Sequence, residues 1–185
     1  MGVALFGGAF DPPHVGHVEL ARAAKKRFEL PQLVVLVSAA PGHKDVHLPA
    51  ETRLELARAA FPGEDIRLDP YPRTIDLLRA EQFDDPLFVI GADEFCDFPT
   101  WKEPDAVLEL TRLAVGTRPG FPTEKIDAAL DKISRLDRVL FFEIDPNPAA
   151  SRDIRGVAEA GGSLDGLVPP AVAAIIAERH LYRGD

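Results

Sequence analysis

The stretch Leu5-Phe6-Gly7-Gly8-Ala9-Phe10-Asp11-Pro12-Pro13-His14-Val15-Gly16-His17 joins an apolar run to a helix-forming pattern. The run over residues 3–6 is typical of a buried strand, and apolar side chains recur at helical spacing over residues 18–28. Two glycines, two histidines and an acidic residue lie between the two elements. A strand-to-helix turn of this kind is where an α/β sheet presents its ligands. The stretch therefore predicts a fold class and a binding site together.

The glycines and histidines of this turn favour a phosphate ligand. Backbone N–H groups at a helix start are unpaired and carry partial positive charge, which attracts phosphate. Gly7 and Gly8 let the backbone approach a ligand with no Cβ in the way. With His17 in the first helical turn, its ring and that of His14 can face one pocket and donate hydrogen bonds to phosphate oxygens.

Two other interpretations of the histidine pair stay open. The HxxH spacing could hold a metal ion, although Asp11 is the only further ligand candidate close by. The histidines could also be surface residues beside a purely structural turn. Neither GxGxxG nor GxxxxGK(S/T) occurs in the chain, which disfavours a dinucleotide-type turn and a P-loop.

The turn resembles the GGxFDPxHxGH motif of the nucleotidylyltransferase superfamily and matches it at every defined position. The resemblance implies that ATP is bound by Gly7, Gly8, Phe10, His14 and His17 and that the two histidines are catalytic. It also implies that magnesium (Mg2+) enters with the ATP triphosphate, so we expect no dedicated metal site in the protein.

Length and composition limit the function classes. A chain of 185 residues suits a single domain spanning residues 1–185. One cysteine, Cys96, excludes an internal disulfide framework and fits a reducing compartment, and no signal peptide or membrane-spanning run is visible, so we expect a cytoplasmic protein. The net charge of -9 argues against nucleic-acid binding but not against ATP, because a local cluster of cations can hold a triphosphate.

Strand and helix patterns alternate along the chain. We expect strands at Val3–Phe6, Leu33–Val37, Asp65–Leu68, Leu87–Ile90, Leu113–Val115 and Val139–Phe142. We expect helices at His17–Glu29, Ala50–Ala60, Thr74–Gln82, Glu103–Leu110, Thr123–Ser134, Ser151–Ala158 and Pro170–Glu178. Short apolar strands are typical of a sheet covered on both faces. The alternation predicts an α/β fold, a Rossmann-like doubly wound parallel sheet with helices on both faces.

The loop after the second expected strand, Ser38-Ala39-Ala40-Pro41-Gly42-His43-Lys44, resembles the PxxxPxHK element of bacterial nicotinate-nucleotide adenylyltransferases. The leading prolines are only partly kept, whereas His43 and Lys44 match the HK pair. The resemblance implies that Lys44 contacts the acceptor and is catalytic, since a lysine supplies a mobile positive charge to phosphate. The alternative is a solvated surface lysine.

The segment Arg73-Thr74-Ile75-Asp76-Leu77-Leu78 resembles the SYTIDTL element of the same family. It departs from that element at Pro72, Arg73 and Leu77. The resemblance implies that the turn at Thr74 binds the nicotinate end of the acceptor through backbone N–H groups, and a carboxylate suits a helix N-terminus. The alternative is that Thr74 only caps its helix.

Two more elements follow the fourth and fifth expected strands. Ile90-Gly91-Ala92-Asp93-Glu94-Phe95, with Trp101 beyond it, resembles the GAD…W element and implies that Gly91 and Asp93 bind ATP. Trp101 could stack on the pyridine ring of the acceptor, or it could serve packing alone. Arg118-Pro119-Gly120 resembles the RPG element and implies that Arg118 binds the acceptor.

The segment Ala149-Ala150-Ser151-Arg152-Asp153-Ile154-Arg155 takes the place of the ISSTxIR element, with departures at Ala149, Ala150 and Arg152. The resemblance implies that ATP phosphates are bound by Ser151, Arg152 and Arg155, and that Arg155 is catalytic. We expect Ser151 to be the N-cap of its helix, with Arg155 one turn further along. The alternative is an ordinary capped helix with exposed arginines. The chain from Leu167 to Tyr182 also resembles the ending of these enzymes.

The resemblance covers essentially the whole chain and implies adenylyl transfer from ATP to nicotinate mononucleotide, which gives deamido-NAD and pyrophosphate. ATP and a mononucleotide acceptor are then the partners, with no nucleic acid, no membrane and a possible homo-oligomer. One alternative is a nucleotidylyltransferase for nicotinamide mononucleotide or another phosphorylated acceptor. A different class is a nucleotide-binding regulatory protein without turnover, because the element at 149–155 is altered.

Overall fold

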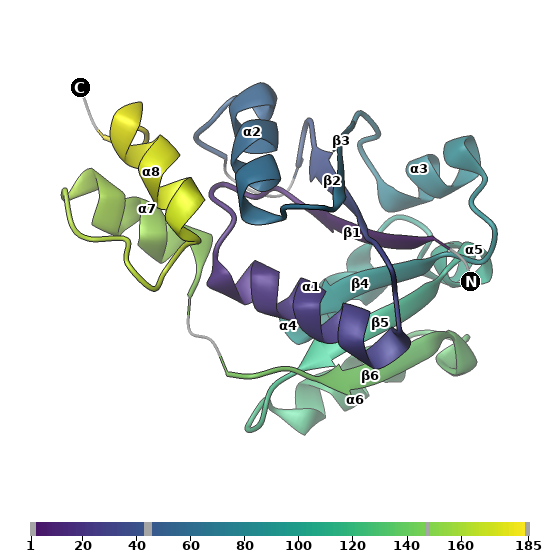
Figure 1. Cartoon of the computed structure of the whole chain (residues 1–185). Coiled ribbons are helices and arrows are strands. Elements are labelled where there is room, and N and C mark those ends of the chain that lie inside the picture. The colour runs from purple at the N-terminus through teal and green to yellow at the C-terminus, as the bar shows by residue number, and fades with distance from the viewer. Residues whose placement is uncertain (1–2, 43–45, 147–148, 184–185) are drawn as a thin grey trace.

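Six parallel strands form one sheet in the order β3-β2-β1-β4-β5-β6 (Figure 1). The computed structural model describes residues 3–42, 46–146 and 149–183. The strands are β1 (Ala4–Gly8), β2 (Val34–Ser38), β3 (Asp65–Asp69), β4 (Leu87–Gly91), β5 (Arg112–Thr117) and β6 (Val139–Glu143). The first strand lies between β2 and β4, so the strand order reverses beside β1. In sheets of this kind the ligand crevice lies at that reversal, beyond the carboxyl ends of the strands.

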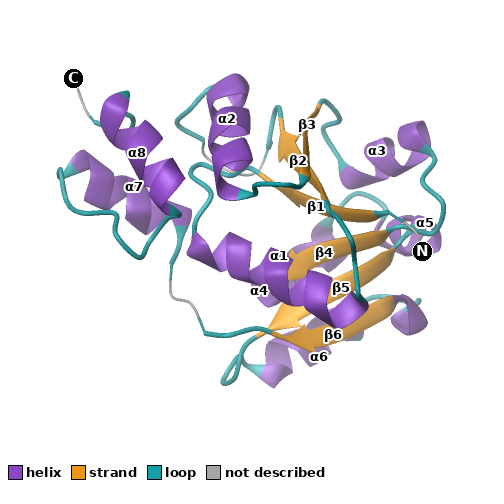
Figure 2. Ribbon diagram, viewed as in Figure 1, coloured by secondary structure: helices purple, strands orange, loops and turns teal. Residues whose placement is uncertain are grey.

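Helices cover both faces of the sheet (Figure 2). They are α1 (Val15–Phe28), α2 (Ala50–Ala60), α3 (Thr74–Glu81), α4 (Ala92–Asp97), α5 (Pro104–Leu110), α6 (Thr123–Leu130), α7 (Ser151–Glu159) and α8 (Pro170–Glu178), with short 3-10 turns at Phe98–Thr100 and Leu136–Arg138. One apolar core packs α1, α2, α7 and α8 against one face of the sheet. A second core packs α3, α4, α5 and α6 against the opposite face. The predicted Rossmann-like α/β fold is confirmed.

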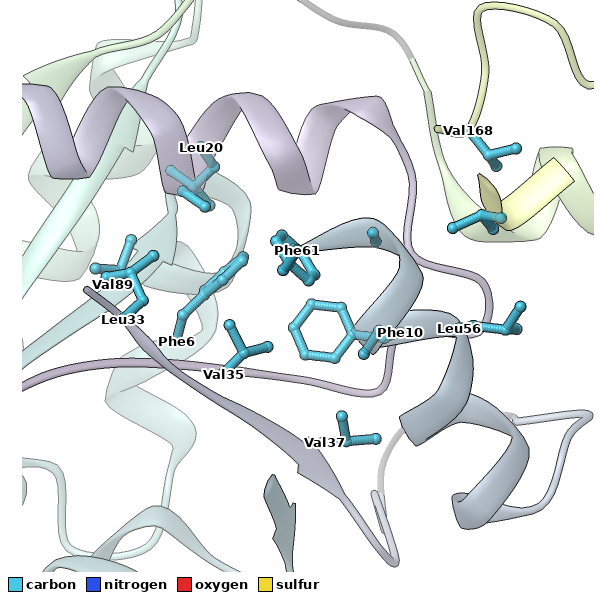
Figure 3. Close-up of a cluster of buried hydrophobic side chains, with 14 of the residues drawn as sticks. Phe6, Phe10, Leu20, Leu33, Val35, Val37, Leu56, Phe61, Val89 and Val168 are labelled. Atoms are coloured by element: carbon cyan, nitrogen blue, oxygen red, sulfur yellow. The ribbon is translucent and has the colours of Figure 1, made fainter. Parts of the chain in front are cut away.

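The first core reaches up to the end of β1. Phe10 is 1% exposed and meets the rings of Phe6 and Phe61 edge to face, with centroids 5.5 and 5.6 Å away (Figure 3). Its backbone has a positive φ of 51°. A Cβ on Gly8 would lie 2.8 Å from the Phe10 ring, so glycine at this position is required by packing. The turn after β1 is thereby fixed to the core beneath it.

The expectation that both faces of every strand are covered holds only in the middle of the sheet. The central strand β4 is buried along most of its length, whereas β3 has no fully buried residue and β6 has fully buried residues only at Val139 and Phe142. The reason is position, because β3 and β6 are the two edges of the sheet and helices cover an edge less completely.

Element boundaries differ from the prediction at a few points. Helix α1 begins at Val15 rather than His17, because His14 already takes the N-cap position. Helix α6 ends at Leu130 rather than Ser134, where the amides of Lys132 and Ile133 turn back onto carbonyls three residues earlier. Helix α4, directly after β4, was not expected. Within the described part of the chain, no helix is long and apolar enough to cross a membrane.

Candidate functional site

The two histidines of the turn after β1 face each other at the start of α1. Their rings stack with centroids 3.7 Å apart and planes 30° from parallel. The Nδ1 atom of His17 accepts a hydrogen bond from the backbone N–H of His14 at 3.2 Å. This bond fixes the ring of His17 in the first helical turn and leaves its Nε2 directed away from that amide. The two rings therefore lie together at the helix start, and that they face one ligand pocket stays a prediction.

His14 is held in an environment that disfavours its charged form. The residue is 9% exposed, and its Nδ1 atom has no hydrogen-bond partner in the described structure. Burial lowers the pKa of His14 to about 4. The ring is therefore neutral at physiological pH and carries one N–H that can be donated to an oxyanion.

Asp11 holds this turn in place through hydrogen bonds to its buried side chain. Its side chain is 2% exposed and has a hydrogen-bond donor for each oxygen: the hydroxyl of Tyr182 lies 2.7 Å from Oδ1, and the backbone N–H of His47 donates to Oδ2. Both oxygens are therefore occupied within the protein, which leaves Asp11 poorly suited to bind a metal ion.

Helix α7 approaches the same turn with Ser151 and Arg155. The Ser151 hydroxyl donates to the carbonyl of Pro12 at 2.9 Å, and Nη1 of Arg155 donates to the carbonyl of Asp11 at 2.9 Å. The expectation that Ser151 is the N-cap is wrong, because Ala150 holds that position and makes no side-chain cap. The Ser151 hydroxyl instead bonds across to the turn after β1.

Arg152 lies on the outer side of α7. It is exposed, and the structure gives it neither an ion pair nor a hydrogen bond to any described residue. Its neighbour Arg155 is half-buried. The structure therefore holds Arg155 beside the histidine turn, whereas Arg152 lies at the surface.

Sequence reasoning missed Arg53, which joins the loops after β1 and β2. Its guanidinium is almost fully buried at 1% exposure and donates to the carbonyls of Ala9, Ser38, Ala39 and Leu48. Burial lowers the pKa of Arg53. A signal was present in the sequence, because an arginine stands on the apolar stripe of the 50–60 helix, three, four and seven positions before buried Leu56, Ala57 and Ala60.

A cavity of about 440 Å³ opens on the other side of the β1 exit. Its floor is formed by the glycine pair and by apolar residues of neighbouring strands, and α3 and the segment around Trp101 form its walls. The lining includes Gly7, Gly8, Ala9, Leu36, Ser38, Pro41, Gly42, Asp69, Tyr71, Pro72, Arg73, Thr74, Phe88, Ile90, Glu94, Asp97, Thr100, Trp101 and Lys102. The volume suits a small-molecule ligand.

Trp101 and Thr74 both line this cavity. Trp101 is half-buried and lies edge-on to Phe88 and Phe98, with centroids 6.4 and 5.2 Å away. Its indole therefore packs on the core while remaining part of the wall. Thr74 is the first residue of α3 and does not cap it, since Arg73 holds the N-cap position without a side-chain hydrogen bond. The alternative in which Thr74 is the cap is therefore wrong.

Charged groups of both signs surround the cavity. Nη1 of Arg73 donates to the Pro72 carbonyl at 2.8 Å, and a Cβ on Gly42 would lie 3.4 Å from that nitrogen. The guanidinium thus spans from α3 to the loop after β2. Nζ of Lys102 lies 2.9 Å from Oδ1 of Asp76.

Three of the residues implied by the resemblance lie elsewhere. Gly91 ends β4 and is the N-cap of α4. Asp93 on α4 and Arg118 after β5 approach to 3.6 Å, both well exposed, and neither lines the cavity. Lys44, together with His43, lies outside the described residues. Phe10 turns its side chain into the core, so only its backbone is available to a ligand.

Among the residues described, no cluster of three or more His, Cys, Asp or Glu could hold a metal ion.

The geometry can be compared with known proteins. Residues 5–157 match the cytidylyltransferase-like family. A probable nicotinate-nucleotide adenylyltransferase of Solibacter usitatus is 37% identical over 98% of this chain and 100% of its own length. Another, from Rubrobacter xylanophilus, is 32% identical over 100% of this chain and 94% of its own length. The chain belongs to the nicotinate-nucleotide adenylyltransferase family.

The solved structures agree in fold. Plasmodium falciparum nicotinic acid mononucleotide adenylyltransferase, complexed with NaAD, superposes with a TM-score of 0.71 at 17% identity, covering 97% of this chain and 96% of that one. At that identity the likeness concerns the fold alone. The family membership read from the sequence motifs is confirmed by the relatives, and the chain is therefore a nucleotidyltransferase by family.

Proposed function

We propose that the protein transfers the adenylyl group of ATP to nicotinate mononucleotide, forming deamido-NAD and pyrophosphate. One observation carries the proposal beyond family membership. Gly7 and Gly8 lie in the floor of the cavity, and the same backbone continues directly into the histidine turn. An acceptor in the cavity would therefore present its phosphate next to a nucleotide held at the start of α1.

The chemistry requires little more than positioning and charge stabilisation. The acceptor phosphate attacks the α-phosphorus of ATP in line, and pyrophosphate leaves with the electrons of the broken P–O bond. A phosphate is already a competent nucleophile, so no general base is needed. Donors aimed at the oxygens that gain charge lower the barrier.

We assign the donors as follows. His14, in its neutral form, would donate to an oxygen of the α-phosphate together with His17, and Arg155 would add a guanidinium from α7 to the phosphates that leave. Ser151 and Arg152 would assist at the same helix start, and Gly91 and Asp93 would contact the nucleoside. On the acceptor side, Lys44 would meet the phosphate, with Thr74 and Trp101 at the pyridine end and Arg118 further out.

Magnesium fits this arrangement as a companion of the triphosphate. The described residues offer no carboxylate cluster, and Asp11 has both oxygens occupied by donors of the protein. When bound to the triphosphate, the ion would neutralise charge on its oxygens. We place the reaction in the cytoplasm, because the single Cys96 suits a reducing compartment.

Turnover of an acceptor panel tests the proposal. Purified protein is incubated with ATP and Mg2+ and with either nicotinate mononucleotide, nicotinamide mononucleotide or a phosphorylated sugar, and pyrophosphate release is measured. We expect kcat/KM to favour nicotinate mononucleotide over the amide by about 10-fold or more, since a helix N-terminus prefers an anion. Equal efficiencies or an amide preference would refute the acceptor assignment, and ATP binding without any turnover would indicate a regulatory protein.

A further inference from the structure

The end of the chain returns to the turn after β1. Tyr182 follows α8, and its hydroxyl lies 2.7 Å from Oδ1 of buried Asp11 although the two residues are 171 positions apart. Figure 1 shows α7 and α8 together beside the loop that joins β1 to α1. The contact therefore connects the C-terminal segment to the turn that carries the histidines.

The hydroxyl of Tyr182 acts as a permanent donor in this contact. Burial, helped by the Asp11 carboxylate, raises the pKa of Tyr182 well above its ordinary value, so the proton stays on the phenol. A carboxylate as buried as that of Asp11 is expensive to leave without donors. One of its two oxygens depends on Tyr182, and the other on the backbone of His47.

The same C-terminal segment holds the next residues of the turn. The carbonyl of Asp11 accepts from Arg155, the carbonyl of Pro12 accepts from Ser151, and the N–H of Val15 donates to the carbonyl of Leu167 at 3.1 Å. With the Tyr182 contact, this makes four hydrogen bonds between residues 151–182 and residues 11–15. His14 lies between these bonded residues, so hydrogen bonds from the C-terminal segment fix its position relative to a bound nucleotide.

The acceptor cavity is built without this segment. Every residue that lines it falls between Gly7 and Lys102. A change confined to the C-terminal hydrogen bonds should therefore act on the nucleotide side of the site and spare the acceptor side.

We infer that Tyr182 is a positioning residue for the nucleotide: by holding Asp11 it sets the turn on which His14 and His17 meet ATP. The inference rests on the proposed function for its kinetic consequence. The effect of the Tyr182 hydroxyl on ATP affinity does not depend on which acceptor the protein uses.

The test removes one oxygen atom. Tyr182→Phe keeps the ring and its packing, and we expect kcat/KM for ATP to fall about 10-fold and calorimetric ATP affinity to weaken about 5-fold, as for loss of a hydrogen bond to a charged group. Acceptor affinity, followed by the fluorescence of Trp101 in the cavity wall, should stay within about 2-fold. The matched control is Arg179→Gln, which removes an exposed ion pair between the residue that follows α8 and Glu55 of α2 and should leave both affinities unchanged.

A second variant shows whether the effect passes through Asp11. Asp11→Asn keeps the side-chain shape but can satisfy only one of the two donors, so it should weaken ATP binding by itself. In the double variant, Tyr182→Phe should add less than 2-fold to that loss, as for residues that share one hydrogen bond. If Tyr182→Phe does not fold, Asp11→Asn is the test. It should weaken ATP affinity and leave acceptor affinity unchanged, and equal losses of the two affinities would contradict the inference.

Several outcomes would overturn the inference. These are unchanged ATP affinity in Tyr182→Phe, equal losses of ATP and acceptor affinity, the same loss in Arg179→Gln, or additive effects with Asp11→Asn. Failure of the proposed function would appear differently, as absence of turnover in the unmodified protein. The calorimetric comparison of ATP affinities would still hold in that case.

Discussion

The two sides of the β1 exit are built in opposite ways. On the side that we propose for the nucleotide (the nucleotide side), Asp11 and His14 are buried, and residues 151–182 hydrogen-bond to the turn at several points. On the side that we propose for the acceptor (the acceptor side), a cavity is rimmed by exposed side chains such as Arg73 and Lys102. The sequence follows the same division, since residues 7–17 match the superfamily motif at every defined position, whereas the SYTIDTL-like element departs from its pattern at Pro72, Arg73 and Leu77.

The two sides should differ in how strongly an amino-acid substitution affects the protein. A buried polar group whose partner is removed loses its hydrogen bond and keeps its desolvation penalty. An exposed side chain is replaced with little effect on stability. We therefore expect substitutions on the nucleotide side to lower ATP affinity or the rate of the chemical step, and substitutions on the acceptor rim to alter only the choice of substrate.

The largest effect should come from His17. His17→Asn keeps an acceptor for the backbone N–H of His14 and removes the remaining ring nitrogen, so kcat should fall by ~10²-fold or more, as when a preorganised donor is lost. Steady-state pyrophosphate release measures it. The control is His180→Asn, an exposed histidine with φ of 52°, a backbone that asparagine adopts easily. A folded His17→Asn protein with near-normal kcat would remove the histidine from the mechanism.

His14 should make the stability of the fold depend on pH. Its pKa is about 4 in the folded protein against an ordinary value of 6.5, so the unfolded chain takes up the proton first and stability falls as the pH drops between those values. From pH ~7.5 to ~5 this linkage amounts to about 2 kcal/mol. We expect denaturant titrations of His14→Asn, a favourable N-cap, to lose about that much less than the unmodified protein. Parallel pH curves for the two proteins would contradict the assignment.

Much of the scaffold that carries these residues was predictable from local pattern. Helices at Ala50–Ala60 and Pro170–Glu178 begin and end as expected, and all six strands lie where apolar runs predicted them. Periodic apolar residues report burial directly, which is why they locate elements well. Helix α4 was missed because Ala92–Asp97 is too short to show a period.

The connections of the site were harder to predict. The bond between Tyr182 and Asp11 joins residues 171 positions apart, and no local pattern contains that contact. The hydroxyl of Ser151 was expected to cap α7 because capping is the usual local role of serine. Tertiary contact gave it the carbonyl of Pro12 instead. Sequence shows which residue types are present, but the pairing of distant polar groups depends on the assembled fold.

Arg155 gives an intermediate effect that sharpens the comparison. Because its guanidinium lies against the turn and near the start of α7, Arg155→Ala should weaken ATP and pyrophosphate binding about 20-fold, as for a charge-assisted hydrogen bond. Arg152→Ala should weaken ATP binding less, about 3-fold, since that side chain is exposed. Calorimetric titration of ATP compares the two. Unchanged affinity in both variants would make these arginines surface charges.

The smallest effect belongs to the acceptor rim, at Arg73. Its guanidinium lies at the cavity rim, between the start of α3 and Gly42, so it can favour a carboxylate over a neutral amide, but exposure and salt limit such a pair to under 1 kcal/mol. We expect Arg73→Gln to reduce the preference for nicotinate over nicotinamide mononucleotide about 3-fold in kcat/KM, with kcat for the better substrate unchanged. The difference should shrink further at high salt. Arg79→Gln, on the same helix but paired with Glu103, should leave the preference as it is. If Arg73→Gln also leaves the preference unchanged, the preference arises from the backbone N–H groups at the start of α3. The choice of acceptor would then depend on the backbone and not on the exposed side chains of the rim.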